Sequence, residues 1–258
     1  MTVPLDDEGM ICENLEPLIQ QHKPKLLFVN SSFHDPTGIV LSVNRRQKLL
    51  ELANRYRIPI VEEDAASELA FDQDELPMTL KAMDSCENVI YIYSFSLTFI
   101  PGMSLAFVVA PEKLIKSFSY LVSIRMISLD WMNQKLLTNF MKDGRYRKTL
   151  EVIREENRAK AALLCSCLDR LKSLGITYES PKGGVYVWCR LPETLDSREV
   201  AKHCMQKGVS VTPGTVFYPN HNGGFHHVRL NFSFEGEERL LEGMEIFSDV
   251  IIHLTKNV

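Results

Sequence analysis

The sequence contains no long hydrophobic run and no targeting segment. None of its apolar stretches reaches the roughly 18 residues of a membrane-spanning helix. The N-terminus has no basic stretch followed by an apolar one, which a secretory signal requires. The formal net charge is −4, so the chain itself gives no reason to expect non-specific binding of nucleic acid. We therefore expect a cytoplasmic protein that does not contact a membrane.

The sequence also lacks residues spaced as metal ligands. Only Cys165 and Cys167 among its six cysteines are close together, and they lie in a helical pattern, where residues two apart point to different faces. The adjacent His226 and His227 enter a predicted strand, where neighbours face opposite sides. We expect reduced, partly buried thiols and no metal site.

The first half of the chain has the pattern of an α/β domain. Short apolar runs typical of strands lie at residues 26–29, 58–61, 89–93 and 105–110. Residues 42–57 have helical spacing, and Ser42 is suited to the N-cap. Strand–helix–strand alternation favours a mainly parallel sheet. Ligands of such sheets gather at the carboxyl ends of the strands, where two polar segments, residues 62–64 and 94–96, are expected.

The second half has a different pattern. Residues 127–174 are almost wholly helical, with a long helix at 151–174 that Gly175 ends. The remaining predicted strands lie at residues 176–179, 185–189, 209–212 and 228–232, and the remaining predicted helices at 196–207 and 235–254. We expect a partial large domain at residues 1–125, and linking helices with a smaller C-terminal α+β domain at residues 126–258.

The most informative segment follows the strand predicted at residues 89–93. It reads S-F-S-L-T-F-I-P-G at residues 94–102. This segment resembles the lysine segment of the class I/II aminotransferases, enzymes of fold type I that use pyridoxal 5'-phosphate (PLP). The fourth residue of that segment is the lysine that forms a Schiff base with PLP. Leu97 stands there in this chain and has no amine, so the resemblance implies the fold without its central catalytic group.

Asp35 lies in a second segment that resembles the family. F-H-D-P-T-G at residues 33–38 is similar to F-Q-D-P-T-G in the aminotransferase-like domains of MocR-type regulators, which are GntR-family transcriptional regulators. The enzymes have N-P-T-G, whose asparagine donates a hydrogen bond to the phenolate oxygen of PLP. An ionised Asp35 can only accept. Either Asp35 lines a ligand site, or the segment is simply a turn after a strand.

Glu63 lies in a third such segment. I-V-E-E-D-A-A-S-E-L at residues 60–69 resembles the family's I-V-E-D-D-x-Y-x-E-L, whose first aspartate pairs with the pyridinium nitrogen of PLP. Glu63 stands at that aspartate, and Asp64 is expected to point the other way along the strand. Ala66 replaces the aromatic residue of the family and can neither stack nor donate. The alternative is that these carboxylates form a solvated end of the strand.

The residues that would bind the phosphate of PLP are kept only in part. The resemblance makes Ser94 and Ser96 the phosphate-binding hydroxyls. G-M-S-L-A at residues 102–106 resembles the family's G-x-R-x-G, so Ser104 replaces an arginine that contacts the phosphate. A hydroxyl lacks the charge and the bidentate grip of a guanidinium. We therefore expect PLP to bind weakly or not at all.

The second half keeps the family pattern more fully. P-K-G-G-V-Y-V-W at residues 181–188 and V-T-P-G-T-V-F at residues 211–217 resemble P-x-G-G-x-F-x-W and V-x-P-G-x-x-F. H-V-R-L-N-F at residues 227–232 is similar to the strand whose arginine binds the α-carboxylate of the substrate. Arg229 is suited to that contact. The alternative is an arginine that pairs with a surface acid.

The resemblance also has implications for assembly. In the family, a front portion precedes the residues that this chain resembles, and it carries a phosphate-binding turn and the aromatic residue that stacks on PLP. Without that portion, the strands at residues 26–110 are expected to leave an apolar face or edge uncovered. Fold type I proteins place the active site at a two-fold interface, which implies a homodimer.

Three functions are compatible with the sequence. The first is a non-catalytic effector or dimerisation module of a GntR/MocR-type regulator, which would take an amino-acid or PLP-like effector. Such a regulator would bind DNA only through a segment outside this chain, since no helix-turn-helix is visible. The second is a PLP-dependent aminotransferase acting on an amino acid, and the third is a gene remnant without function. Leu97, Ser104 and Ala66 argue against the second, and the well-formed second half argues against the third, so we expect the first.

Overall fold

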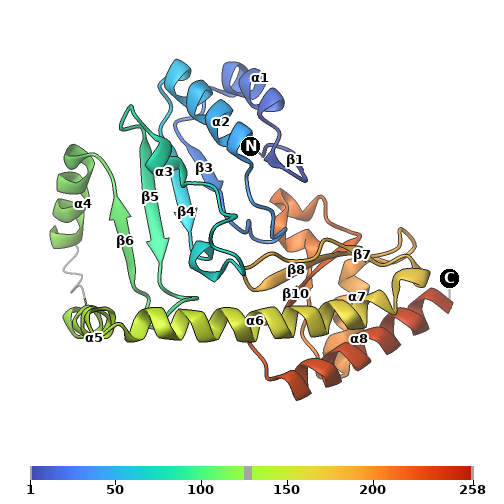
Figure 1. The fold of residues 1–258 in the computed structure, drawn as a ribbon. Helices are drawn as coiled ribbons and strands as arrows, with labels where there is room; N and C mark the ends of the chain where they lie inside the picture. The colour runs from blue at the N-terminus through green and yellow to red at the C-terminus, as the bar shows by residue number, and fades with distance from the viewer. Residues whose placement is uncertain (1, 125–129, 257–258) are drawn as a thin grey trace. The chain divides into compact units, whose positions relative to one another are not determined.

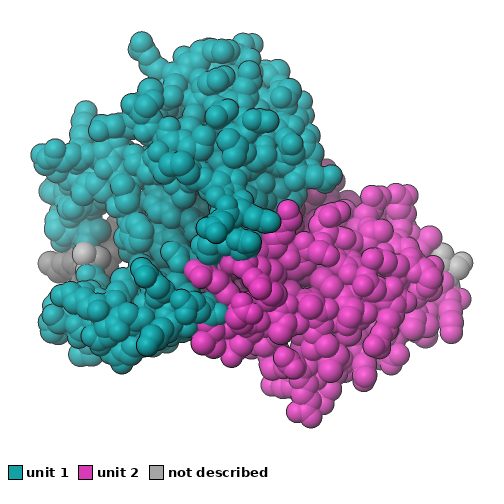
Figure 2. Space-filling model, viewed as in Figure 1, with its two compact units in different colours: residues 1–34, 39–68, 72–151 teal, residues 35–38, 69–71, 152–258 magenta. Residues whose placement is uncertain are grey.

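The computed structural model describes residues 2–124 and 130–256, which form two compact units (Figures 1 and 2). Unit 1 consists of Met1–His34, Ile39–Glu68 and Asp72–Glu151. Unit 2 consists of Asp35–Gly38, Leu69–Phe71 and Val152–Val258. Helix α6 (Arg145–Asp169) begins in unit 1 and continues into unit 2. The domain boundary expected between residues 125 and 126, and the start of the helical stretch expected from residue 127, lie outside the described residues.

Unit 1 contains a four-stranded sheet in the order β3-β4-β5-β6 (Figure 1). The strands are β3 (Leu27–Asn30), β4 (Ile60–Asp64), β5 (Val89–Ser94) and β6 (Ala106–Val109). The first three are parallel, and β6 is antiparallel to β5. The reversal follows from the connection at residues 95–105, which contains no crossover helix to return the chain to the other end of the sheet. The expected mainly parallel sheet is confirmed.

Helices cover part of this sheet and complete unit 1. They are α1 (Cys12–His22), α2 (Val43–Tyr56), α3 (Leu80–Met83), α4 (Glu112–Ile124) and α5 (Trp131–Lys142). The side chain of Ser42 accepts a hydrogen bond from the backbone N–H of Arg45, which confirms the predicted N-cap of α2. Leu49 and Leu52 of α2 are fully buried in one cluster with Leu15 of α1 and Ile60 of β4. A small antiparallel pair, β1 (Leu5–Asp6) and β2 (Gly9–Met10), precedes α1.

A buried cation lies inside unit 1. Arg46 of α2 is fully buried, and burial lowers the pKa of its guanidinium. The guanidinium donates to the carbonyl oxygens of Ser31, Leu41 and Met78 at 2.7, 2.8 and 3.2 Å, and to Oγ of Ser32 at 3.3 Å. Its Nη1 lies 3.7 Å from Oε1 of Glu62, whose side chain is also fully buried. The carboxylate opposes the lowering of the Arg46 pKa and keeps the cation compensated.

Unit 2 contains an antiparallel sheet in the order β7-β8-β10-β9. The strands are β7 (Thr177–Tyr178), β8 (Tyr186–Arg190), β9 (Thr212–Pro213) and β10 (His227–Asn231). The helices α7 (Ser197–Gln206) and α8 (Glu237–Lys256) accompany the sheet. The helical stretch that α6 begins continues through the 3-10 turn η2 (Lys172–Leu174) and ends at Gly175, whose φ of 90° is left-handed. The expected α+β pattern is confirmed here.

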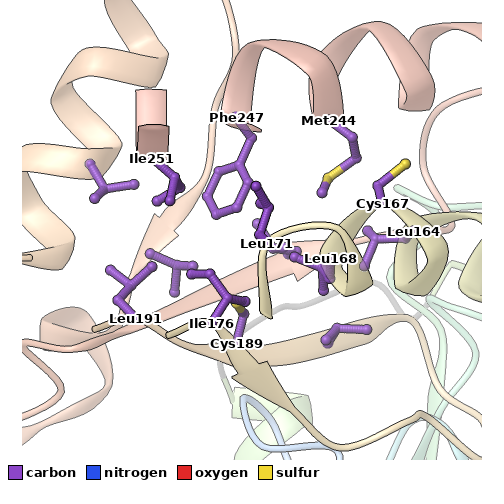
Figure 3. Close-up of a cluster of buried hydrophobic side chains, with 14 of the residues drawn as sticks. Leu164, Cys167, Leu168, Leu171, Ile176, Cys189, Leu191, Met244, Phe247 and Ile251 are labelled. Carbon is purple, nitrogen blue, oxygen red and sulfur yellow. The ribbon is translucent and has the colours of Figure 1, made fainter. Parts of the chain in front are cut away.

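The core of unit 2 lies between one face of this sheet and the long helices (Figure 3). Val187 and Cys189 of β8 and Val228 and Leu230 of β10 all face the core, as a period of two requires. Leu168 of α6 and Phe247 of α8 are among the helical residues that complete it. The side chains of Tyr186, Trp188 and Arg229 therefore lie on the opposite face of the sheet.

The cysteines are free thiols, as expected. Burial raises the pKa of Cys189 to about 12 and that of Cys204 to about 11. Both therefore stay protonated at neutral pH and act as small apolar residues. Among the described residues, no helix is both long and apolar enough to cross a membrane.

We predict that Arg46→Ala lowers the free energy of unfolding of unit 1 by about 3–5 kcal/mol, because it leaves the buried carboxylate of Glu62 without a cation. Arg55→Ala is the matched control on the same helix. Arg55 pairs with Glu16 at the surface, so its loss should cost less than about 1 kcal/mol. Urea unfolding followed by circular dichroism measures both. Equal effects of the two substitutions would contradict the role given to Arg46.

Candidate functional site

The topology of unit 1 brings the predicted cofactor residues other than Asp35 to the end of the sheet where its parallel strands finish. Glu63 lies near the carboxyl end of β4, and Ser94 ends β5. Ser94 pairs with Ala106 at the start of antiparallel β6, so Ser104, two residues before Ala106, lies at the same end of the sheet. Ser96 and Leu97 are in the turn that follows β5. The prediction that these residues gather at strand ends is therefore met for unit 1, while their role in binding stays a prediction.

The three acidic residues of β4 have different surroundings. Glu62 is buried and accepts from Oγ of Ser31 at 2.6 Å and from the backbone N–H groups of Leu80 and Lys81, both at 2.8 Å. Asp64 is buried on the same side of the strand as Glu62. The carboxylate of Glu63 points the other way and is partly exposed, as expected from strand alternation. A solvated strand end therefore describes neither Glu62 nor Asp64.

The carboxylate of Asp64 is fixed by neighbouring hydroxyls. It accepts from the Tyr91 hydroxyl at 2.7 Å, and from Oγ and the backbone N–H of Ser67 at 2.6 and 3.0 Å. Burial and the hydrogen bond to Asp64 raise the pKa of Tyr91, so its phenol stays protonated. Asp64 thus holds the segment that follows β4 in place.

Glu63 retains capacity for a ligand. It accepts one hydrogen bond from Nδ2 of Asn30, at 3.2 Å, across the parallel pair of β3 and β4. Oδ1 of Asn30 is buried and has no hydrogen-bond partner within the part of the chain that the structure describes. A carboxylate with lone pairs still exposed can pair with a protonated nitrogen. Asn30 was missed by sequence reasoning, because only its place at the end of a predicted strand could have pointed to it.

Hydrogen bonds fix the turn that carries Leu97. Oγ of Ser94 donates to Oγ of Ser96 at 3.0 Å and accepts from the backbone N–H of Ser96 at 3.3 Å. Thr98 is fully buried, and its Oγ1 accepts from the Tyr146 hydroxyl at 3.0 Å. The two serine hydroxyls therefore lie together, and because Ser94 gives its proton to Ser96, the Ser96 hydroxyl is the one left to donate to an anion. Leu97 is held between these anchored residues, with its side chain partly exposed.

The residues of unit 1 do not fit a covalently bound PLP. Leu97 cannot form an imine, and no lysine or arginine occurs anywhere in residues 94–104. Ser104 is exposed at φ 51° and offers a hydroxyl where a phosphate dianion would need a cation. Lys81 does not replace the missing amine, because its Nζ donates to the carbonyl oxygen of Val89 at 2.9 Å, at the amino end of β5. Glu63 is compatible with the ring nitrogen of PLP, and the two serines are compatible with its phosphate. These residues supply neither the covalent bond to PLP nor a positive charge beside the phosphate.

Unit 2 contains the second group of predicted site residues. Arg229 of β10 lies directly opposite Trp188 of β8, so Tyr186 is a diagonal neighbour on the same face of the sheet. The guanidinium carbon of Arg229 lies 4.0 Å from the centre of the Tyr186 ring and 4.9 Å from that of Phe217. Both rings present a face to the cation at a distance typical of cation–π contact. Phe217, the last residue of the motif at residues 211–217, thus contacts the arginine.

Asp35 is the carboxylate that pairs with Arg229. Nη1 of Arg229 donates to both carboxylate oxygens of Asp35, at 2.6 and 2.8 Å, although the residues are 194 positions apart. Asp35 belongs to the short segment of residues 35–38 that packs in unit 2. The arginine is thus paired with an acid, and that acid is itself a predicted site residue. The sequence did not indicate that the two would meet.

Aromatic side chains extend this face of the sheet. The ring of His227 stacks on Trp188 with centres 5.0 Å apart and an interplanar angle of 8°. Trp188 also meets Phe217 edge-on at 5.7 Å. Burial, with the nearby charge of Arg190, lowers the pKa of His227, which favours the neutral ring. Burial likewise raises the pKa of Tyr186, so its phenol stays neutral beside Arg229.

Among residues 2–124 and 130–256, no three His, Cys, Asp or Glu side chains gather as a metal site would require. The predicted site residues of unit 1 and of unit 2 offer carboxylates, hydroxyls and one guanidinium to a ligand.

Comparison with known proteins is consistent with this architecture. The family described as aminotransferase class I and II matches residues 1–242. The chain belongs to this family. It is 30% identical over 246 residues to a 2-aminoadipate transaminase of Thermus thermophilus, covering 95% of this chain and 62% of that protein. It is 27% identical over 242 residues to YdfD, an uncharacterized HTH-type transcriptional regulator of Bacillus subtilis, covering 94% of this chain and 49% of the regulator.

A solved structure gives the same picture. LysN, an alpha-aminoadipate aminotransferase of Thermus thermophilus complexed with N-(5'-phosphopyridoxyl)-L-leucine, superposes with a TM-score of 0.92 at 30% identity. The match covers 100% of this chain and 66% of LysN. The chain thus spans about three fifths of the transaminase it matches and about half of the regulator. The fold of a PLP-dependent aminotransferase is shown, and the family contains both enzymes and regulators.

We predict that the protein binds PLP weakly and does not develop the yellow absorbance of an internal aldimine. Leu97→Lys alone should not produce tight binding, because Ser104 still supplies no charge to the phosphate. Adding Ser104→Arg to that variant should tighten binding by at least about tenfold, since a lost charge partner costs roughly 2–5 kcal/mol. Absorbance spectra before and after dialysis report the result. A stable yellow protein from Leu97→Lys alone would refute this account of the phosphate site.

Proposed function

We propose that this chain is a non-catalytic aminotransferase-like domain, and that it serves as the effector-binding and dimerisation module of a GntR/MocR-type transcriptional regulator. Leu97 is the observation that carries the first part. A transaminase needs an amine that forms the aldimine and moves the α-proton of the substrate. A leucine in an ordered turn provides neither, and Lys81 is bound at the other end of β5.

The regulatory part rests on two further observations. F-H-D-P-T-G at residues 33–38 resembles the motif of the MocR-type domains more closely than the enzymes' N-P-T-G. A regulator of the HTH type matches 94% of the chain but only 49% of its own length, so it has room for further segments such as a DNA-binding one. DNA would be bound through a segment outside these 258 residues. The effector would be an amino acid or a PLP-like molecule.

A homodimer would cover exposed apolar surface of unit 1. β6 pairs only with β5 in the described part of the chain and forms an edge of the sheet. Its Phe107, Val108 and Val109 are each about two fifths exposed (43%, 40% and 43%). Large apolar side chains of α4 and α5 are exposed as well: Phe118, Tyr120, Leu121, Ile124, Trp131 and Met132. An unpaired strand edge beside apolar side chains favours association with a second chain.

The protein should not transaminate. Incubation with PLP and a panel of amino acids, followed by detection of oxo acids, should give no turnover above that of free PLP. Leu97→Lys with Ser104→Arg tests whether restoring the amine and the phosphate charge restores any activity. Lys81→Ala is the matched control and should leave the background rate unchanged. Turnover by the unaltered protein would favour the alternative of a PLP-dependent aminotransferase and overturn the proposal.

The isolated chain should elute as a poorly soluble dimer or larger species. Val108→Lys on the edge strand should reduce this association, because a charge on an edge strand opposes further pairing. Met205→Lys, at an exposed position of α7 in unit 2, is the control and should have no effect. Light scattering after size exclusion gives the mass of each variant. A monomer that unfolds cooperatively would exclude the dimerisation role.

A further inference from the structure

Asp35 lies on a short closed turn. The backbone N–H of His34 donates to the carbonyl oxygen of Ile39 at 2.8 Å, which ties together the two ends of the D-P-T-G segment. Gly38 has a left-handed φ of 74°, and a Cβ there would lie 3.8 Å from the carbonyl oxygen of Tyr186, so the turn runs along β8. A carboxylate fixed in this way acts at a far higher effective concentration than one that is free in solution.

The carboxylate of Asp35 and the guanidinium of Arg229 form a pair without net charge. Nη1 of Arg229 donates to both carboxylate oxygens, at 2.6 and 2.8 Å. The rings of Tyr186 and Phe217, with centres 4.0 and 4.9 Å from the guanidinium carbon, limit the directions from which a ligand can reach the cation. The cation is thus already bound to an anion that belongs to the chain itself.

A second carboxylate at Arg229 would be unfavourable. The side chain of Arg229 is only 19% exposed, so a ligand that reached it would lie next to Asp35. Two carboxylates beside one guanidinium repel each other, and a ligand that displaced Asp35 would have to open its turn. The asparagine that stands at position 35 in the enzymes is neutral, so it does not cancel the charge of the arginine. The aspartate of this chain does.

We propose that Asp35 is an internal carboxylate that occupies Arg229 and prevents free carboxylates from binding at this face of the unit 2 sheet. The contact is autoinhibitory, because an acid of the chain takes the place of an external one. The inference rests on the proposed function and narrows the effector to a molecule that is recognised without a carboxylate on Arg229.

Calorimetric titration of the full chain with benzoate, in the absence of PLP, tests the contact. Benzoate carries one carboxylate, no amine and an aromatic ring that suits the rings beside Arg229. Asp35→Asn should bind benzoate at least about tenfold more tightly than the unaltered protein, because it removes the like charge. Adding Arg229→Gln to Asp35→Asn should abolish the gain. Asp35→Asn without a gain in affinity, whether it binds weakly or not at all, would overturn the proposal.

Chemical modification gives a second reading that needs no bound ligand. Phenylglyoxal reacts with accessible guanidinium groups, and mass spectrometry of the peptides reports how fast Arg229 is modified. Asp35→Asn should raise this rate several-fold relative to that of Arg190, whose side chain is 55% exposed in both proteins' common surface pair. An unchanged rate at Arg229 would contradict its occupation by Asp35. Asp35→Ser replaces the first variant in both experiments should Asp35→Asn lose its thermal transition.

The matched control is Glu193→Gln, which also removes a carboxylate beside an arginine. Glu193 pairs with Arg190 at 3.1 Å on the surface of the same unit. This variant should bind benzoate as the unaltered protein does, and a gain equal to that of Asp35→Asn would overturn the proposal by showing a general effect of charge. Turnover with PLP would overturn the proposed function and leave the effect of Asp35→Asn intact. Loss of that effect would overturn the present inference alone.

Discussion

Unit 1 is organised around the buried guanidinium of Arg46. Its donors satisfy the carbonyl oxygens of Ser31 and Leu41 on the chain that follows β3, and of Met78 before α3. Glu62 compensates the charge from β4 and accepts from the start of α3. A buried charge is tolerated only when its partners are all in place, so this network fixes the loops around the sheet to one arrangement. The predicted site residues of unit 1 lie at the carboxyl ends of the strands, next to these loops, so the same network holds their backbone in place.

Local patterns predicted most of the fold and several positions of the site. Short apolar runs located most strand ends within two residues, but β4 ends three residues later and β9 begins three residues later than expected, and the short pair β1 and β2 was not expected. Ser42 and Gly175 marked helix ends because capping depends on a single residue. The sequence did not predict which of the three carboxylates of β4 would be buried. Strand alternation predicted that Glu63 points away from Asp64, but burial of Glu62 depends on Arg46, which lies on another element.

Contacts between distant segments could not be predicted. Asp35 and Arg229 are 194 residues apart, and each was assigned a separate role toward a ligand. Only the folded chain shows that residues 35–38 pack with the second unit. Tyr186 and Trp188 were seen as parts of a motif, and their use as aromatic neighbours of the arginine required the register of β8 against β10. The register of two paired strands is set by which of their faces is buried. The sequence shows the apolar pattern of each strand but does not show which strand it pairs with.

The fold can persist without the chemistry of its family because the two use different side chains. The cores consist of residues such as Leu49, Ile60, Val187 and Phe247, and the buried charges at Arg46 and Glu62 face inward. Leu97 and Ser104 lie in the connection between β5 and β6, and neither is buried, so the core does not depend on which side chains stand there. Arg229 lies on the face of β10 opposite the core, so a change of its charged partner removes no core contact and can leave its contacts with the rings of Tyr186 and Phe217 in place. A ligand-binding role for Arg229 and its aromatic neighbours therefore does not require a lysine at position 97.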